Sequence, residues 1–555
     1  MLRLAGGKLV DPTQSPAERT GDLWIDGDRI VAPPADGGKG ATVQDISGKL
    51  VMAGAIDIHS HIAGGKVNLG RLLSSADHRA SVEAAEAGLR GGSGLATPST
   101  FTTGYRYAAM GYTAAFEPAM VAANARATHI EMADVPILDK GAYVMLGNDE
   151  FLLRRLAAGA SQSEINDYVA WTIQAAAAHA VKVVNAGGIS AFKFGARSLG
   201  IDEPVPQHGV TPRRIIQALS RAVNELGVPH PLHVHCNNLG IPGNVETTLA
   251  TIEAAEGFPI HLTHVQFHSY GTEGKRKFSS AAARIAEAVN ANPNVSVDVG
   301  QIVFGPTMTE SGDTQAQFRN RSHAAPKKWL VMDIECDAGC GLVPFRYRDK
   351  NFVNALQWAI GLELFLLIRD PWRVFLTTDH PNGGPFASYP QLVRLLMERS
   401  YREECLAQIN ASARKLSVLG GIAREYTLAE IAAMTRAAPA KSLGLRDRGH
   451  LAPGARADLA IYQPGGDLEA MFRAPVQVLK GGVEVARDGR IRSVPAGATQ
   501  LVRPGYDKQI ERTLKRFFDD HMTVRFGNFP LSDGEIAEAG GRVEEHACVA
   551  SGGRP

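Results

Sequence analysis

The hydrophobic pattern divides the chain into two kinds of segment. Near both ends, apolar and polar positions alternate with a period of two, as in GDLWIDGDRIV and APVQVLKGGVEVARDGRI. Such alternation predicts short strands with one buried face. We therefore expect a small composite β-sandwich domain whose first part is residues 1–52 and whose second part is residues 446–503.

Residues 53–445 show short apolar runs, each followed by a stretch with helical periodicity. Examples of the apolar runs are ISAFKFGA, PLHVHCNN, PIHLTHVQF and WRVFLTTDH. Strands that alternate with helices predict a parallel sheet with crossover connections. The number of such units fits an α/β fold of the (β/α)8 TIM-type barrel, with an insertion at about 305–350. Residues 504–555 would be a C-terminal extension whose last fifteen or so residues are disordered.

Composition excludes several functional classes. The 58 basic and 57 acidic residues leave a net charge of +1, which gives no global field for nucleic acid or an anionic membrane. Five cysteines are too few for a disulfide framework and favour a reducing compartment. Apolar stretches are interrupted by polar residues, so we expect a cytoplasmic protein without a membrane span.

Two histidines form the strongest local signal for chemistry. His59 and His61 follow the apolar run VMAGAIDI. Residues two apart in a strand face the same side, so both imidazoles can reach one metal ion. By itself, the pair is equally typical of an exposed strand.

Four more residues stand where apolar runs end. Barrel enzymes place their catalytic groups at the carboxyl ends of the strands, and here Lys193, His235, His264 and Asp379 occupy such positions. Alternatives remain for single members, because a strand lysine is commonly an exposed end or half of an ion pair, and an aspartate commonly caps a helix.

Other polar residues in this region have weaker signals. His233 lies deeper in its strand than His235 and is expected to be packed behind the site. The residues expected to contact a substrate are Asn237, His268 and Asn382.

The ordered set of residues resembles the amidohydrolase superfamily, whose members hold a binuclear metal centre in a (β/α)8 barrel. Longer segments narrow this resemblance: IDIHSHIAGGKVNLGR, LHVHCNNLGIPGNVETT, HLTHVQFHSYG, ALQWAIGLELFLLI and TTDHPNGGPF. They are similar to the alpha-chain family of formylmethanofuran dehydrogenase, and most of all to its bacterial members in the formyltransferase/hydrolase complex. The similarity extends from about residue 1 to 525.

The resemblance implies a site and a reaction. It assigns two divalent metal ions, with zinc as the first choice, to His59, His61, a carboxylated Lys193, His235, His264 and Asp379. Asp379 would also be the catalytic base. The implied reaction is hydrolysis of the N-formyl group of formyl-methanofuran or formyl-methylofuran, which yields formate and the free amine in one-carbon metabolism.

The resemblance also implies partners, among them a formyltransferase subunit in a hetero-oligomer. We expect the 305–350 insertion and the extension after Arg503 at the interface. Two alternative functions remain open from the sequence. One is a cyclic-amide hydrolase resembling dihydropyrimidinase, and the other is a scaffold subunit that has lost its metals.

Overall fold

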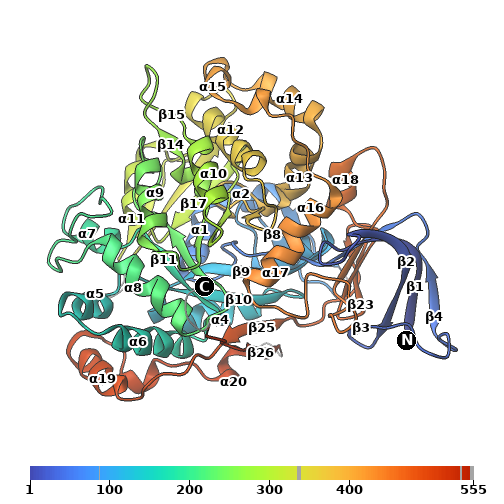
Figure 1. Ribbon diagram of the computed structural model, residues 1–555, viewed down its shortest axis with the longest axis horizontal. Coiled ribbons are helices and arrows are strands. Elements are labelled where there is room, and N and C mark those ends of the chain that lie inside the picture. The colour runs from blue at the N-terminus through green and yellow to red at the C-terminus, as the bar shows by residue number, and fades with distance from the viewer. Residues whose placement is uncertain (87, 334–338, 538–540, 551–555) are drawn as a thin grey trace.

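A computed structural model describes residues 1–86, 88–333, 339–537 and 541–550 of the chain. A large α/β unit carries a smaller β domain at one side, which lies at the right of Figure 1. Among the described residues, the helices are too short or too polar to cross a lipid bilayer.

Parallel strands form the barrel, as predicted. The order of pairing is β6-β9-β10-β11-β12-β13-β16-β20, and every pair is parallel. A parallel bridge between Ser60 and His380 connects the first strand to the last. The bounds are β6 (Ala55–Asp57), β9 (Tyr112–Met120), β10 (Asp139–Leu146), β11 (Ala180–Val184), β12 (Leu232–His235), β13 (Ile260–Leu262), β16 (Val295–Asp298) and β20 (Val374–Phe375).

Helices connect successive barrel strands. Several have clear start signals, such as Thr211 at the start of α8, whose hydroxyl accepts from the Arg214 backbone and is followed by Pro212. The main connecting helices are α1 (Gly65–Leu73), α3 (Thr100–Ala109), α4 (Ala125–Ala133), α5 (Glu150–Ala157), α6 (Gln162–Ala175), α7 (Gly188–Lys193), α8 (Pro212–Glu225), α9 (Val245–Ala254), α10 (Ala282–Ala291), α12 (Phe352–Leu367) and, after the last strand, α13 (Tyr389–Met397) and α17 (Ala438–Ser442). The α/β barrel is thereby confirmed.

The composite β domain is also confirmed, and its strands form one continuous mixed sheet. The order is β24-β23-β22-β21-β5-β1-β2-β3, with β4 beside β1. Antiparallel pairing of β5 with β21 joins the two distant segments. The bounds are β1 (Leu2–Val10), β2 (Glu18–Asp26), β3 (Arg29–Val31), β4 (Thr42–Asp45), β5 (Leu50–Ala53), β21 (Leu459–Tyr462), β22 (Gln477–Lys480), β23 (Val483–Arg487) and β24 (Arg490–Ile491).

The C-terminal part differs from expectation in two places. Residues 498–502, expected in the β domain, form β25 (Ala498–Val502), which pairs with β10 of the barrel sheet. The prediction of disorder over the last fifteen or so residues is wrong for β26 (Arg542–His546), because this segment pairs along the free edge of β25. Residues 551–555 lie outside the described residues. The helix α19 (Ile510–His521) packs near α6, below the barrel in Figure 1.

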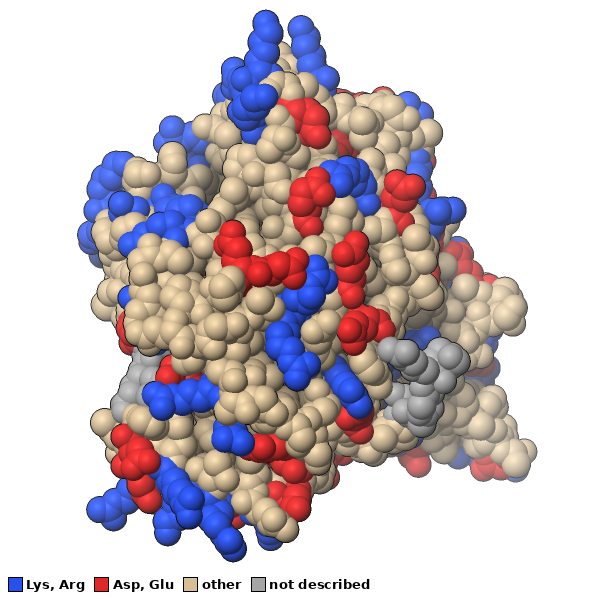
Figure 2. Space-filling model, turned by 60° about the vertical axis from the view of Figure 1, so that its left-hand side comes forward, with Lys and Arg blue, Asp and Glu red and all other residues tan. Residues whose placement is uncertain are grey.

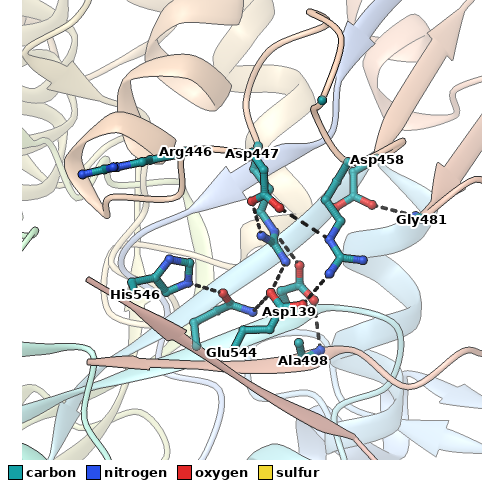
Figure 3. Close-up of polar contacts among 12 residues, drawn as sticks. Asp139, Arg446, Asp447, Asp458, Gly481, Ala498, Glu544 and His546 are labelled. Atoms are coloured by element: carbon teal, nitrogen blue, oxygen red, sulfur yellow. Dashed lines mark hydrogen bonds and ion pairs between the residues drawn. The ribbon is translucent and has the colours of Figure 1, made fainter. Parts of the chain in front are cut away.

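A buried ion-pair network joins the barrel, the β domain and β26 (Figure 3). Asp139, the first residue of β10, accepts hydrogen bonds from Lys480 (2.6 Å), Arg448 (2.8 Å) and the Ala498 backbone (2.9 Å). Arg448 also donates to Glu544 of β26 at 2.5 Å. The network therefore lies at the amino end of the barrel strands, where it connects segments far apart in sequence.

The insertion folds over the opposite end of the barrel. It contains β17 (Gly305–Ser311), α11 (Thr314–Asn320), β18 (Leu330–Met332) and β19 (Cys340–Tyr347), and the strands form an antiparallel sheet in the order β17-β19-β18. Asp313, between β17 and α11, reaches His235 with a carboxylate oxygen 3.1 Å from Nε2. The insertion thus contributes a residue to the carboxyl end of the barrel.

Candidate metal centre

Asp379 and two histidines meet at the carboxyl end of the barrel. An oxygen of Asp379 lies 2.8 Å from Nε2 of His59 and 3.2 Å from Nε2 of His61. All three side chains are almost completely buried. The expected pairing of the early HxH motif with the late aspartate therefore exists in space, although 320 or so residues separate them in sequence.

His235 and His264 complete the same group. Their ring centroids are 4.6 Å apart, and the ring of His264 is 5.4 Å from that of His59. His264 and Asp379 both have a left-handed backbone, with φ of 36° and 50°. Such conformations are uncommon outside glycine and collect at functional sites, where the surrounding structure holds them in place.

Buried carboxylates hold these histidines from behind, and sequence reasoning did not find them. Glu117 lies 3.1 Å from Nδ1 of His61, and Asp313 lies 3.1 Å from Nε2 of His235. Asp298 accepts from the backbone of His264 at 2.9 Å. Carboxylates in this position fix ring orientation and raise the basicity of the imidazole.

Electrostatics keep these acids ionised. Burial raises the pKa of Asp313, but the hydrogen bond and charge of His235 outweigh this effect and bring its pKa to about 2. Burial likewise opposes ionisation of Asp379, whereas His264 and His59 hold its pKa well below the usual range. The centre therefore presents carboxylates as acceptors at neutral pH.

Lys193 does not join this group. The expectation that it ends a strand is wrong, because Lys193 is the last residue of helix α7. Its side chain is 29% exposed, and its Nζ lies 2.7 Å from Asp333 of the insertion. Gly187, with a φ of 65°, starts that helix directly after β11, so the chain turns away from the barrel before it reaches Lys193.

A different lysine lies in the site. Lys182 is in the middle of β11 and lines the same cavity as His61, His235 and Asp379. Its side chain is buried, and burial lowers its pKa to about 8, partly offset by Asp379 and Asp298. Lys182 thus has the burial, the strand position and the weakened charge that the sequence argument had assigned to Lys193.

The cavity at this end of the barrel has a volume of about 250 Å³. Of the three expected substrate contacts, Asn382 lines it and donates to Asp379 at 3.1 Å. Asn237 instead donates to the backbone of Ala186 at 3.0 Å, and it is not among the lining residues. His268 lies behind the wall, with its ring centroid 5.2 Å from that of His264.

The donor set suits a divalent metal. Within the described residues, ligand atoms of His59, His264 and Asp379 lie within 4.8 Å of one another, as do those of His235, His264 and His268. His264 Nδ1 and both ring nitrogens of His268 are buried without a hydrogen-bond partner. Buried polar atoms are rarely left in this state, so a missing ligand explains them. Imidazole and carboxylate ligands together are typical of zinc and related ions.

The barrel, the split β domain and this cluster agree with the comparison to a known family. The model of the amidohydrolase family matches residues 42–492. The chain belongs to the amidohydrolase family. Its metal-ligand set, apart from the position of the lysine, follows the resemblance found in the sequence.

Individual relatives of this amidohydrolase are more specific. The FhcA protein of the formyltransferase/hydrolase complex of Methylorubrum extorquens is 44% identical and covers 99% of this chain and 100% of its own. The protein FwdA of Methanocaldococcus jannaschii is 40% identical over 96% of each chain.

A solved structure agrees with the sequence comparison. It is a crystal structure of the FhcABCD complex of Methylorubrum extorquens with methylofuran, and one of its chains matches with a TM-score of 0.94 over 99% of this chain and 100% of that chain. The resemblance to this branch of the family is thereby confirmed.

Proposed function

We propose that this amidohydrolase cleaves the N-formyl group of formyl-methanofuran or formyl-methylofuran, releasing formate and the free amine. The observation that carries the proposal is Asp379, whose carboxylate lies between His59 and His61 at the base of an enclosed cavity. The 44% identical relative, whose complex was solved with methylofuran, supports the substrate class.

The residues that would hold two divalent ions, with zinc as the first choice, are His59, His61, Lys182, His235, His264 and Asp379. When bound, such ions supply an activated water and polarise the formyl carbonyl. Lys182 would act as a bridging anion after its neutral amine adds to CO2, which forms an N-carboxylate and releases one proton. Burial favours this step because it lowers the pKa of Lys182 to about 8 and so populates the neutral amine.

Asp379 would carry the proton during the reaction. As the water attacks the formyl carbon, Asp379 accepts its proton, and the C–N bond then breaks while Asp379 returns that proton to the amine nitrogen. The net change is addition of one water to the formamide, which gives one amine and one formic acid. Asn382 holds an oxygen of Asp379 at 3.1 Å and so fixes the direction of that carboxylate.

The outer part of the cavity supports an uncharged aromatic substrate. Phe267, Phe345 and Tyr347 line it together with the amides of Asn354 and Gln357. Aromatic walls bury ring surface, and amide groups hydrogen-bond without requiring a charge on the ligand. A furan carrier fits this lining better than a charged peptide.

We also propose that the chain works with a formyltransferase partner, as the name of its Methylorubrum relative indicates for that complex. A carrier that stays bound near both active sites is present at a high effective concentration. Figure 2 shows acidic and basic side chains mixed over one face without a field of one sign, so on that face shape and local pairs would decide the docking.

A substrate panel tests the proposed function. The chain, purified from its own organism with whatever partner proteins accompany it, is given two divalent ions per chain and assayed on a formylated furfurylamine and on a dihydropyrimidine. Release of formate from the first substrate only is the expected result. Turnover of the cyclic amide alone would favour a dihydropyrimidinase-like activity, and less than about one tightly bound ion per chain would favour a scaffold.

A further inference from the structure

A chain of hydrogen-bonded imidazoles extends behind His59 through the interior of the barrel. Nδ1 of His59 lies 2.9 Å from Nε2 of His233, and Nδ1 of His233 lies 2.9 Å from Nε2 of His230. Nδ1 of His230 then lies 3.0 Å from the hydroxyl of Ser442, the last residue of α17. The chain ends beside a second cavity of about 680 Å³, which Pro229, Pro231 and Gly444 help to line. It therefore connects the two ends of the barrel.

Aromatic neighbours fix the rings of this chain. Tyr143 stacks on His230 with centroids 5.1 Å apart, and His261 stacks on His233 at 4.7 Å. His261 itself hydrogen-bonds elsewhere, to Ser296 and Asp298. The rings cannot rotate without disturbing this stack, so the hydrogen bonds between them are held in place by packing.

Each of the two inner rings carries a single proton. Burial lowers the pKa of His230 and of His233 well below the usual value, and the neighbouring histidines lower it further. A neutral imidazole has one donor nitrogen and one acceptor nitrogen. A bond from one ring to the next therefore sets which nitrogen of the second ring is the donor.

The metal centre selects one direction for the whole chain. His59 faces Asp379 with Nε2, so a bound ion leaves the proton of His59 on Nδ1. If that N–H donates to Nε2 of His233, then His233 must donate from Nδ1 to His230. His230 must in turn donate from Nδ1 to Ser442, whose hydroxyl accepts.

Two other contacts compete for Nδ1 of His59. Thr263 also hydrogen-bonds this nitrogen, and an oxygen of Asp298 lies 3.5 Å from it. These contacts share the proton of His59 but do not supply a donor for His233. An ion between His59 and His233 is excluded by distance, because two nitrogens on one zinc are roughly 3.3 Å apart when each bond is about 2.0–2.1 Å.

We propose that His233, His230 and Ser442 are positioning residues that lock His59 in its metal-binding tautomer from the far end of the barrel. The proposal rests on the metal site assigned above. None of the three residues lines the substrate cavity. Their removal should therefore change metal affinity and kcat while KM for the substrate stays the same.

The test compares variants of the full chain by metal retention. His230→Phe keeps the stacking on Tyr143 but removes both hydrogen bonds, and Ser442→Ala removes only the terminal acceptor. Competition with a chromophoric chelator measures the dissociation constant of the bound ions. We expect about a tenfold weaker affinity in His230→Phe, the lower end of the range for groups that orient metal ligands, and a smaller loss in Ser442→Ala.

Matched variants separate positioning from packing. Ser442→Thr retains the hydroxyl and should restore the affinity lost in Ser442→Ala. His179→Phe changes another fully buried histidine that bonds the backbone of Leu443, next to Ser442, but lies outside the chain. This control should bind metal as tightly as the unchanged protein.

A spectroscopic measurement reads the tautomers directly. In metal-loaded protein with 15N-labelled histidine, long-range 1H–15N spectra should show His59, His233 and His230 all protonated on Nδ1. Protonation of His233 on Nε2 in the loaded protein would overturn the proposal, as would equal metal affinity in Ser442→Ala and the unchanged protein. If His230→Phe fails to fold, the serine pair still decides. Tight metal binding without formamide hydrolysis would reject only the proposed function.

Discussion

The two ends of the barrel both bury charged groups, but they satisfy them differently. At the amino end, Asp139 receives three donors from three separate segments. At the carboxyl end, His264 Nδ1 and both ring nitrogens of His268 have no partner. A buried network with its donors and acceptors matched contributes to structure, whereas unmatched buried atoms have a desolvation cost that only a ligand removes. The contrast separates the functional end of the barrel from the structural one.

The largest expected effect is at the carboxyl end. Asp379→Asn should lower formamide hydrolysis by about 10²–10⁴-fold, because an amide cannot accept the proton of the attacking water. Metal content, measured in parallel by atomic emission, should stay near that of the unchanged protein. Near-normal turnover in a metal-loaded variant would show that Asp379 is not the base.

The matching change at the amino end should affect stability and leave catalysis unchanged. Asp139→Asn leaves Arg448 and Lys480 buried with one fewer counter-charge, and we expect a loss of about 3 kcal/mol in the free energy of unfolding. Denaturant titration measures it, with kcat as the second readout. Glu545→Gln on β26 is the control, since its carboxylate is 55% exposed and lies 3.7 Å from Arg503, so the change should fall within about 0.5 kcal/mol. A fall in kcat with unchanged stability would reverse the roles of the two ends.

A smaller effect concerns acid stability. Burial lowers the pKa of His179 from 6.5 to about 3, with His546 as the second cause. Because the folded pKa is the lower one, the neutral form stabilises the fold fully above pH 6.5, and this contribution is lost as the pH falls towards 3. In His179→Gln, the free energy of unfolding should therefore depend less steeply on pH between 6 and 4, by up to about 1.4 kcal/mol per unit. Parallel curves for variant and unchanged protein would contradict this assignment.

Much of the site could be predicted because its residues follow apolar strands. His59, His61, His235, His264 and Asp379 each come at or just after such a run, and a barrel brings these positions together. The carboxylates behind them could not be predicted in this way. Asp313 is 78 residues from His235 and reaches it through the fold of the insertion.

The lysine shows how a local signal was misread. Both lysines follow apolar residues, but Lys182 lies among the β-branched residues of AVKVV, whereas Lys193 comes after the Gly-Gly pair at 187–188. β-Branched residues favour strands, and a glycine in the left-handed conformation starts the helix that carries Lys193. The disorder predicted for the C-terminus had a similar cause, since β26 depends on β25 as its pairing partner.

A crystal structure of the metal-loaded protein, with anomalous data at the metal absorption edge, tests the central claim most directly. We predict two ions between Lys182 and Asp379, a carboxylate on Nζ of Lys182, and an unmodified Lys193 still paired with Asp333. Lys182→Ala should then lose the ions, and Lys193→Ala should retain them. An unmodified Lys182 directed away from the ions, or a carboxylated Lys193 between them, would contradict the account.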